Sequence, residues 1–368
     1  MSPPPVPPRR RPPLGPLAAI AAIAAIAAVV AVAGTGFLYA AGRLGDTPPT
    51  ARTLIGAIEA AAGPHPGYRR AHSRGVCVGG WFEGAADGAA LSAARVFAQG
   101  RVPVLGRLSI GGGDPHGAEA GARVRSLALQ LRSDDGAEWR LAMNSFPFFA
   151  VPSAEAFLEQ TRAQTPDPAT GKPDPAQMAA VLAKYPSARA FRDWAANAPW
   201  PDSWANTTYN GIHTFVFVAP DGRRQPLRWS LRPRAPLVEM DAAARAAATP
   251  DYLAAEFARR LAAGPVAWDL VATLPAPGDA LDDPSQPWPA QRPTRTLGTL
   301  WLDTMAPQAE GACRDVNFDP TVLPPGIERS GDPILAVRAA VYAHSFNRRE
   351  REIARGQAPE ATGQGGKP

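Results

Sequence analysis

The chain has 368 residues, of which 45% are hydrophobic, and it contains 42 prolines and 34 glycines. This length fits one large domain or two small ones, and the proline and glycine content favours long irregular connections over a helical bundle. The net charge is +5, and the run Arg9–Arg11 supplies three of these charges, which leaves the remaining body nearly neutral. Because no basic patch interleaved with aromatic residues remains, we expect no nucleic-acid partner.

The N-terminal segment predicts a membrane helix. Residues 1–16 are rich in proline and arginine and predict a disordered cytoplasmic segment. Residues 17–41 carry no charge, and a helix of about 25 residues at 1.5 Å per residue exceeds the roughly 30 Å hydrocarbon core. The arginines before it predict a cytoplasmic N-terminal side, so the body is expected on the periplasmic or extracellular side.

Two alternatives to an uncleaved anchor stay open. The first is a cleaved signal peptide, with the residues up to Ala41 as a cleavage site. We favour the anchor over it, because the apolar part of a signal peptide usually has only about 7–15 residues. The second alternative is a fully buried helix of a soluble domain.

The next residues predict a mixed α and β body. Residues 42–64 predict a linker and a short helix over 53–62, which Gly63 and Pro64 end. A further helix is predicted over 250–263. Leucines that alternate with other residues and hairpin turns predict strands at 127–131, 214–218, 227–231, 266–274 and 296–302. Strands dominate and helices are inserted among them, so the pattern predicts an α+β domain built on an antiparallel β-barrel.

The last predicted helix carries an unusual pair of side chains. Asp332 is a good N-cap and Pro333 fits the first helical position. Arg338 and Tyr342 are four residues apart, so the guanidinium can reach the phenol oxygen. A free phenol has a pKa of about 10, and a nearby arginine lowers that pKa. A tyrosinate ligand of haem iron needs such a partner, although the spacing alone is also that of an ordinary helical pair.

Five short blocks along the chain strengthen this interpretation. Residues 318–328, just before the Arg338–Tyr342 pair, read Phe-Asp-Pro-Thr-Val-Leu-Pro-Pro-Gly-Ile-Glu. The others read Arg-Arg-Ala-His-Ser-Arg-Gly at 69–75, Arg-Leu-Ser at 107–109, Asn-Ser-Phe-Pro-Phe-Phe at 144–149 and Gly-Ile-His-Thr-Phe at 211–215. Taken from the N-terminus to the C-terminus, the five blocks resemble the motifs of the haem catalase family in the family's order, over roughly residues 65–350. The short chain and the apolar N-terminal segment resemble its compact subgroup, the catalase-related or catalase-like peroxidases.

The resemblance implies a fold, a cofactor and a domain layout. The fold is the catalase-type antiparallel barrel with surrounding helices, and the cofactor is haem, expected as haem b. The haem domain is expected over residues 65–356, followed by a disordered tail over 357–368. Without an N-terminal arm like those that join the larger catalases, a monomer or loose homodimer is expected.

The resemblance also implies roles for individual residues. His72 is the expected acid–base group, since an unperturbed imidazole pKa near 6.5 suits proton shuttling. Asn144 is expected to orient the peroxide, and Ser109 to hydrogen-bond His72. Tyr342 is the expected iron ligand, with His344 as a weak rival. The remaining expected cofactor contacts are Arg69, Arg107, Phe157 and Arg338.

Several positions depart from the family pattern and border the expected pocket. They are Ser73, Arg74, Ser145, Phe146 and the segment 343–347. Together with the shortened chain, they predict a more open pocket that favours organic peroxides and reducing substrates. The expected function is therefore reduction of hydrogen peroxide or organic hydroperoxides by an electron donor. A true catalase, a fatty-acid hydroperoxide lyase or isomerase, and a haem carrier without turnover stay open as alternatives.

The two cysteines, Cys77 and Cys313, leave one further question open. An oxidising compartment permits a disulfide between them. A buried free thiol at Cys77, in a predicted strand, is equally ordinary.

Overall fold

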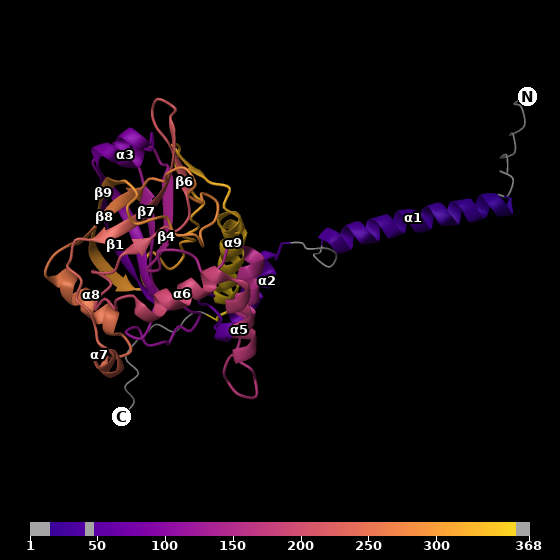
Figure 1. Ribbon diagram of the computed structural model, residues 1–368, viewed down its shortest axis with the longest axis horizontal. Helices are drawn as coiled ribbons and strands as arrows, with labels where there is room; N and C mark the ends of the chain where they lie inside the picture. Colours follow the sequence, from indigo (N-terminus) through magenta and orange to yellow (C-terminus); the bar gives the residue numbers. More distant parts are fainter. Residues whose placement is uncertain (1–14, 41–47, 358–368) are drawn as a thin grey trace, which may run out of the picture. The chain divides into compact units, whose positions relative to one another are not determined.

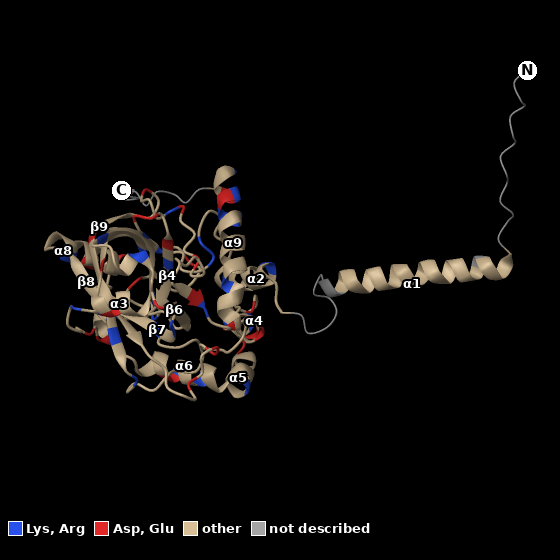
Figure 2. Cartoon of the chain, turned by 90° about the horizontal axis from the view of Figure 1, so that it is seen from above, with Lys and Arg blue, Asp and Glu red and all other residues tan. Residues whose placement is uncertain are grey.

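The computed structural model describes residues 15–40 and 48–357 and divides the chain into two compact units, Met1–Thr50 and Ala51–Pro368. In the first unit, helix α1 (Pro16–Ala40) is long and apolar enough to cross a membrane, although a signal sequence passes the same test. Figure 1 labels this helix, and Figure 2 draws it in tan because its described residues carry no charged side chain. The expected anchor over 17–41 coincides with this helix up to residue 40. The predicted disordered ends and most of the predicted linker lie outside the described residues.

The second unit contains the other elements. Its helices are α2 (Ala51–Ala62), α3 (Ala86–Leu91), the 3-10 turn η1 (Arg95–Phe97), α4 (Ala154–Ala163), α5 (Pro175–Lys184), α6 (Pro186–Asn197), α7 (Ala242–Ala247), α8 (Tyr252–Ala262) and α9 (Pro333–Ala354). Its strands are β1 (Gly75–Gly84), β2 (Arg101–Ile110), β3 (Arg125–Arg132), β4 (Glu138–Asn144), β5 (Tyr209–Asn210), β6 (Phe215–Val218), β7 (Arg224–Pro233), β8 (Val266–Thr273), β9 (Thr294–Pro307) and β10 (Ile327–Arg329).

Eight of the strands close into an antiparallel barrel. The order is β7-β5-β4-β3-β2-β1-β9-β8, and pairing of β8 with β7 closes the ring. Strands β6 and β10 extend the sheet from β7. The predicted α+β barrel with surrounding helices is therefore confirmed, and closure leaves few unpaired strand edges.

Aromatic side chains fill the interior of this barrel. Phe215 stacks on Trp229 with ring centroids 4.2 Å apart, and Trp139 meets Trp229 edge to face at 5.2 Å. Trp139 and Phe215 are at most 1% exposed. Because side chains occupy the interior, a large ligand has to bind outside the barrel wall.

Three helices cover one part of the outer wall. Helices α2, α4 and α9 contact one another, and they lie on the same side of the strands in Figure 2. Glu59 of α2 forms ion pairs with Arg70 at 2.8 Å and with Arg348 of α9 at 2.7 Å. Arg70 is 4% exposed and also pairs with Glu352 of α9. The buried guanidinium of Arg70 therefore has two carboxylate partners, and these ion pairs link α2 and α9 to the residues just before β1.

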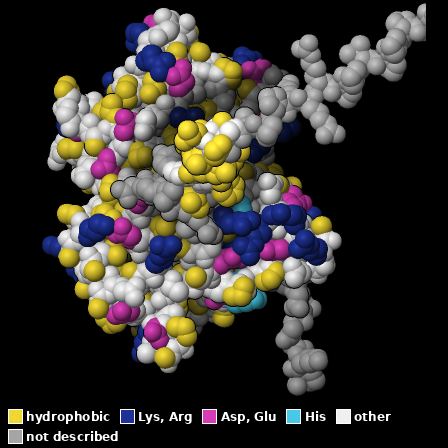
Figure 3. Space-filling view, turned by 90° about the vertical axis from the view of Figure 1, so that its right-hand side faces the viewer, with side chains coloured by type: hydrophobic (Ala, Val, Ile, Leu, Met, Phe, Trp, Pro, Cys, Tyr) yellow, Lys and Arg dark blue, Asp and Glu magenta, His cyan; other side chains and the backbone are white. Residues whose placement is uncertain are grey.

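Charged side chains on the surface are mixed in sign. On the face shown in Figure 3, acidic side chains lie beside the basic ones. Exposed pairs such as Arg95–Asp134 and Arg224–Glu328 have N–O distances of 2.8 Å and 2.5 Å.

The predicted elements agree with the structure at most positions. The predicted helices over 53–62 and 250–263 correspond to α2 and α8, and the five predicted strands correspond to β3, β6, β7, β8 and β9. The last helix continues twelve residues beyond Tyr342, to Ala354. Besides the short helices α3 and α7, the sequence interpretation missed α4, α5 and α6. The capping side chains Ser153 and Asp174, which accept hydrogen bonds from Ala156 N and Ala176 N, were the available signal for α4 and α5.

A substitution at Gly80 tests the packing of the barrel wall. Gly80 lies where the β1–β9 register shifts, and a Cβ there would lie 2.0 Å from the carbonyl oxygen of Trp301. We expect Gly80→Ala to lower the free energy of unfolding by about 3 kcal/mol, because backbone must move. Gly100→Ala is the matched control, since its Cβ would have no atom within 4 Å. Equal urea midpoints for the two variants would contradict this packing.

Candidate active site

A cavity lies between the barrel wall and helices α2, α4 and α9. Its volume is about 660 Å³, within the range of cofactor sites. Strands β2, β3 and β4 supply one wall, and α2, α4 and α9 supply residues around it. Its polar lining residues include Arg69, His72, Arg107, Ser109, Ser126, Asn144, His213, Arg338, Tyr342 and Arg349.

A polar row crosses the strand wall of the cavity. Ser109 lies opposite Ser126, and Ser126 lies opposite Asn144, so the three share one face of β2, β3 and β4. Their neighbours Leu108 and Leu127 are fully buried in the barrel core. The alternation of a strand therefore places apolar residues inside the barrel and this polar row outside it.

His72 reaches this row from the segment before β1. Its Nδ1 lies 3.0 Å from Ser126 Oγ, and Ser126 Oγ donates to Asn144 Oδ1 at 2.5 Å. A serine hydroxyl has one proton, and an amide oxygen only accepts. Nδ1 of His72 therefore carries the proton that Ser126 accepts, which leaves Nε2 with a lone pair. The imidazole is oriented as a base.

The serine that contacts His72 differs from the expected one. Ser109 lines the cavity, as expected of a cofactor contact, but the hydroxyl at hydrogen-bond distance from His72 belongs to Ser126. The expected Ser109–His72 bond is therefore corrected. The two serines are cross-strand partners, and the sequence alone gave no register to choose between them.

The surroundings of His72 keep its ring neutral. Burial lowers its pKa from 6.5 to about 4, and the charges of Arg107 and Arg338 act in the same direction. His72 also has a backbone φ of 56°, in the left-handed region. This conformation costs about 1–2 kcal/mol for a residue with a side chain. Backbone strain of this kind clusters at functional sites.

Helix α9 presents the second reactive group. Arg338 Nη2 donates to Tyr342 Oη at 2.7 Å, so the predicted contact between these side chains is confirmed. Asp332 caps the helix by accepting from Ile334 N at 2.8 Å and from Leu335 N at 3.2 Å. His344, the weak rival, is not among the lining residues of this cavity.

His213 has a larger structural role than the sequence indicated. Its Nδ1 lies 2.6 Å from Asp332 Oδ2, and both side chains are at most 1% exposed. This contact ties the link between β5 and β6 to the start of α9. Burial lowers the pKa of His213, which lines the cavity, and its buried Nε2 has no hydrogen-bond partner among the described residues.

Three arginines surround one end of the cavity. Burial, and then the charge of Arg349, lower the pKa of Arg69 to about 9. Burial and the charges of Arg69 and Arg349 lower the pKa of Arg107 well below its usual value. Arg107 and Arg349 are 3% and 4% exposed. Such mutual repulsion favours an anionic ligand among them. Arg349 was missed, although it lies on the predicted final helix seven residues after Tyr342.

Aromatic rings complete the lining. Phe157 stacks on Phe149 with ring centroids 5.7 Å apart, and both line the cavity with Phe146, Phe318 and Phe346. Phe157, an expected cofactor contact, thus lies at this cavity. From α2, Leu54, Ile55 and Ile58 add aliphatic surface.

Residues 66–352 match the Catalase family, which covers most of the chain. The chain belongs to the catalase family. It is 36% identical over 300 residues to a catalase-related peroxidase of Synechococcus elongatus, covering 82% of this chain and 88% of the relative. It is 31% identical over 306 residues to a catalase-related peroxidase of Mycolicibacterium paratuberculosis, covering 83% of this chain and 96% of that one. A crystal structure of a fungal catalase has the same fold, with a TM-score of 0.69 at 21% identity, covering 77% of this chain and 59% of that chain.

These relationships show a haem peroxidase of the catalase superfamily that acts on peroxide. The lining residues fit haem. A phenol oxygen with a cationic partner has the chemistry of an iron ligand, and the buried guanidinium groups of Arg69 and Arg107 have the chemistry to pair with carboxylates. Aromatic and aliphatic side chains supply apolar contact for the ring.

Ser126 and Ser109 form a matched pair for testing the hydrogen bond to His72. We expect Ser126→Ala to slow the reaction with hydrogen peroxide by about tenfold or more, because the imidazole loses the acceptor that fixes its tautomer. Ser109→Ala should slow it less, since the structure gives Ser109 no bond to His72. Stopped-flow absorbance on the haem-loaded variants measures both rates. A larger loss for Ser109→Ala would reverse the assignment.

The lowered pKa of His72 predicts a pH dependence of stability in the cofactor-free protein. Between about pH 6.5 and pH 4 the unfolded chain binds a proton that the folded protein excludes. The free energy of unfolding therefore falls as the pH falls through this window. His72→Asn removes the titrating group, and asparagine tolerates the left-handed backbone. The free energy of unfolding of this variant should therefore fall less steeply with falling pH than that of the wild type. Urea unfolding at pH 7, 6, 5 and 4 gives the free energy of unfolding of each protein. An equal fall with pH in both proteins would contradict the lowered pKa of His72.

Proposed function

We propose that the protein is a membrane-anchored haem peroxidase that reduces hydrogen peroxide or organic hydroperoxides with electrons from a donor. The observation that carries this proposal is the meeting of two sets of groups in one cavity. His72, Ser126 and Asn144 form a hydrogen-bonded chain on the strand wall, and Arg338 and Tyr342 form a bonded pair on α9.

His72 and Asn144 handle the peroxide. When bound, haem supplies the iron at which the O–O bond of the peroxide is cleaved. His72 Nε2 accepts the proton of the peroxide hydroxyl and returns it to the leaving oxygen. Asn144 Oδ1 is engaged by Ser126, so its amide N–H groups are the part left to orient the peroxide.

Tyr342 is the proposed iron ligand. The hydrogen bond from Arg338 to its oxygen is charge-assisted and stabilises negative charge there. Arg69 and Arg107 are proposed to hold the two carboxylates of haem b, because both are buried without a carboxylate partner, and Arg349, which pairs with Glu350 at 2.9 Å, lies near them. Phe157 and Phe149 supply apolar contact for the ring.

A peroxidase is favoured over a true catalase by two observations. The two relatives described above, at 36% and 31% identity, carry the name catalase-related peroxidase. The sequence also departs from the family pattern around the cavity at Phe146 and over residues 343–347, and Phe146 and Ser345 line the cavity. We propose that these changes admit organic peroxides and reducing substrates.

We further propose that the haem domain lies on the periplasmic or extracellular side and that α1 anchors it. Helix α1 has sufficient length and apolar composition, with three arginines before it. The disulfide between Cys77 and Cys313 supports an oxidising compartment. Because α2 lines the cavity, we propose that the haem domain includes residues from Ala51 onward, before the expected start at 65.

The first experiment supplies full-length, haem-loaded protein in detergent with hydrogen peroxide and an oxidisable dye. We expect dye oxidation with little oxygen release on an electrode. Stoichiometric oxygen with unchanged dye would show a catalase instead.

Two variants test the assigned roles in the same assay. His72→Ala should keep the haem absorbance and lose peroxide chemistry by about 100-fold or more. Tyr342→Phe should change the haem spectrum itself, because it removes the proposed ligand. Unchanged turnover in His72→Ala would contradict the base assignment, and a wild-type protein that holds haem without turnover would be a carrier.

A further inference from the structure

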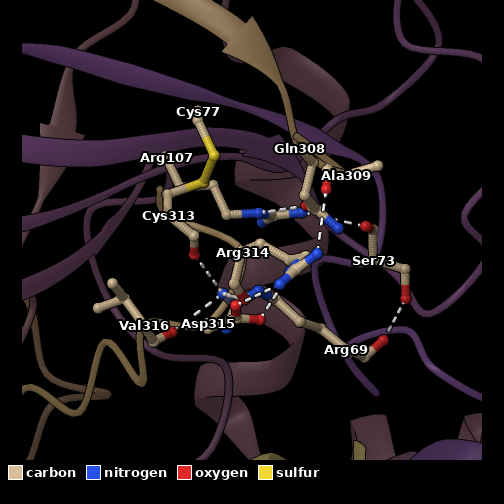
Figure 4. The surroundings of a disulfide bond; sticks show 10 residues. All are labelled: Arg69, Ser73, Cys77, Arg107, Gln308, Ala309, Cys313, Arg314, Asp315 and Val316. Atoms are coloured by element: carbon tan, nitrogen blue, oxygen red, sulfur yellow. Dashed lines mark hydrogen bonds and ion pairs between the residues drawn. A yellow bond between two sulfur atoms is a disulfide. The ribbon is translucent and has the colours of Figure 1, made fainter. Parts of the chain in front are cut away.

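One irregular segment holds two of the three cavity arginines. Residues 308–316 follow β9, and Gln308 Oε1 accepts from Arg107 Nε at 2.6 Å. Further along the segment, three carbonyl oxygens converge on Arg69 Nη2. They belong to Cys313, Arg314 and Val316, at 3.0, 3.1 and 3.0 Å. Both guanidinium groups thus donate to neutral acceptors of this segment, and Arg107 Nη2 also donates to the carbonyl of Ser73 at 3.0 Å; Figure 4 shows these contacts together.

The segment has little structure of its own. It consists of turns, with bonds such as Gly311 N to Pro307 O at 2.9 Å and Arg314 N to Gly311 O at 3.0 Å. Such turns close locally and do not fix the position of a loop against a distant strand. That position depends on an anchor.

The disulfide supplies the anchor. It joins Cys313 to Cys77 across 236 residues, with the Cα atoms 5.4 Å apart. Cys77 lies in β1 directly opposite Arg107 in β2, so the sulfur and the guanidinium leave the same face of the wall. A Cβ at Gly311 would lie 2.5 Å from Cys77 Sγ, so the segment packs directly against the bond.

The bond is also enclosed. Cys77 and Cys313 are 3% and 0% exposed and pack with Phe318, which lines the cavity. The guanidinium of Arg69 lies 5.7 Å from the Phe318 ring centroid. Disulfide, acceptor carbonyls and arginines therefore form one packed unit at the arginine end of the cavity.

We propose that the Cys77–Cys313 disulfide is a positioning element for cofactor retention. It fixes residues 308–316, and through their acceptors it fixes Arg69 and Arg107 against the cofactor carboxylates. This inference rests on the proposed function, because those arginines are assigned to haem there. A chain without the cross-link is expected to fold and to hold haem less tightly.

The test compares haem dissociation from four full-length proteins: wild type, Cys77→Ala/Cys313→Ala, Arg69→Ala and the triple variant. Transfer of haem to excess apo-globin, well below the unfolding temperature, gives each rate. We expect the cysteine variant to lose haem about tenfold faster, as when outer partners of cofactor ligands are removed. If the disulfide acts through Arg69, removing the disulfide from the Arg69→Ala variant should raise the haem dissociation rate by much less than tenfold.

Leu253→Ala is the control for general destabilisation. Leu253 is fully buried in α8, in the barrel core and not in the cavity lining. It should lower the unfolding temperature without an equal rise in haem dissociation. The proposal is overturned if the cysteine variant keeps the wild-type rate of haem dissociation. It is also overturned if Leu253→Ala, with the same unfolding temperature as the cysteine variant, loses haem as fast as that variant does.

A readout without haem separates this inference from the proposed function. Hydrogen exchange of the cofactor-free proteins should speed up over residues 308–316 in the cysteine variant, while β3 and β4 exchange as in the wild type. If wild-type protein holds no haem, the proposed function fails. In that case the anchoring of residues 308–316 by the disulfide is still overturned if these residues exchange as slowly in the cysteine variant as in the wild type. If wild-type protein holds haem and the variant exchanges and dissociates like it, only this inference fails.

Discussion

The register of β2, β3 and β4 is the constraint on which the site depends. Because strand residues alternate, the pairing that buries Leu108 and Leu127 inside the barrel also aligns Ser109, Ser126 and Asn144 outside it. A slip of one residue would place the polar row in the aromatic core. Packing inside the barrel therefore stabilises the geometry of a reactive wall outside it.

Buried charges follow different rules in the scaffold and in the cavity. Arg70 is paired with Glu59 and Glu352, and its charge is satisfied within the protein. Arg69 and Arg107 instead have neutral acceptors, and their lowered pKa values reflect uncompensated burial. Retaining such cations is costly unless a ligand supplies the anions. The two ends of this contrast also occur on α9. At the start of the helix the buried carboxylate of Asp332 contacts His213 within the protein, whereas Tyr342 further along lines the cavity.

Much of the site could be predicted from local pattern. The contact between Arg338 and Tyr342 follows from helical spacing alone, and the blocks around His72 and Asn144 identified both residues as members of one cavity. Ser126 was missed because its role depends on a neighbouring strand, and Arg349 because it lies beyond the motif blocks. The choice between a disulfide and free thiols also needed the register that places Cys77 near residue 313.

By itself, the sequence determined the period-two strands, the capped final helix, the apolar N-terminal segment and the order of the motifs. These depend on neighbours within a few residues, where backbone geometry and side-chain spacing are fixed by covalent structure. The tertiary structure decided which serine meets His72, which arginines share the cavity, and that Cys77 and Cys313 join. The contact of Ser126 with His72 joins residues 54 positions apart, and the disulfide joins residues 236 positions apart. Such contacts form only when the barrel closes and brings distant segments to one wall.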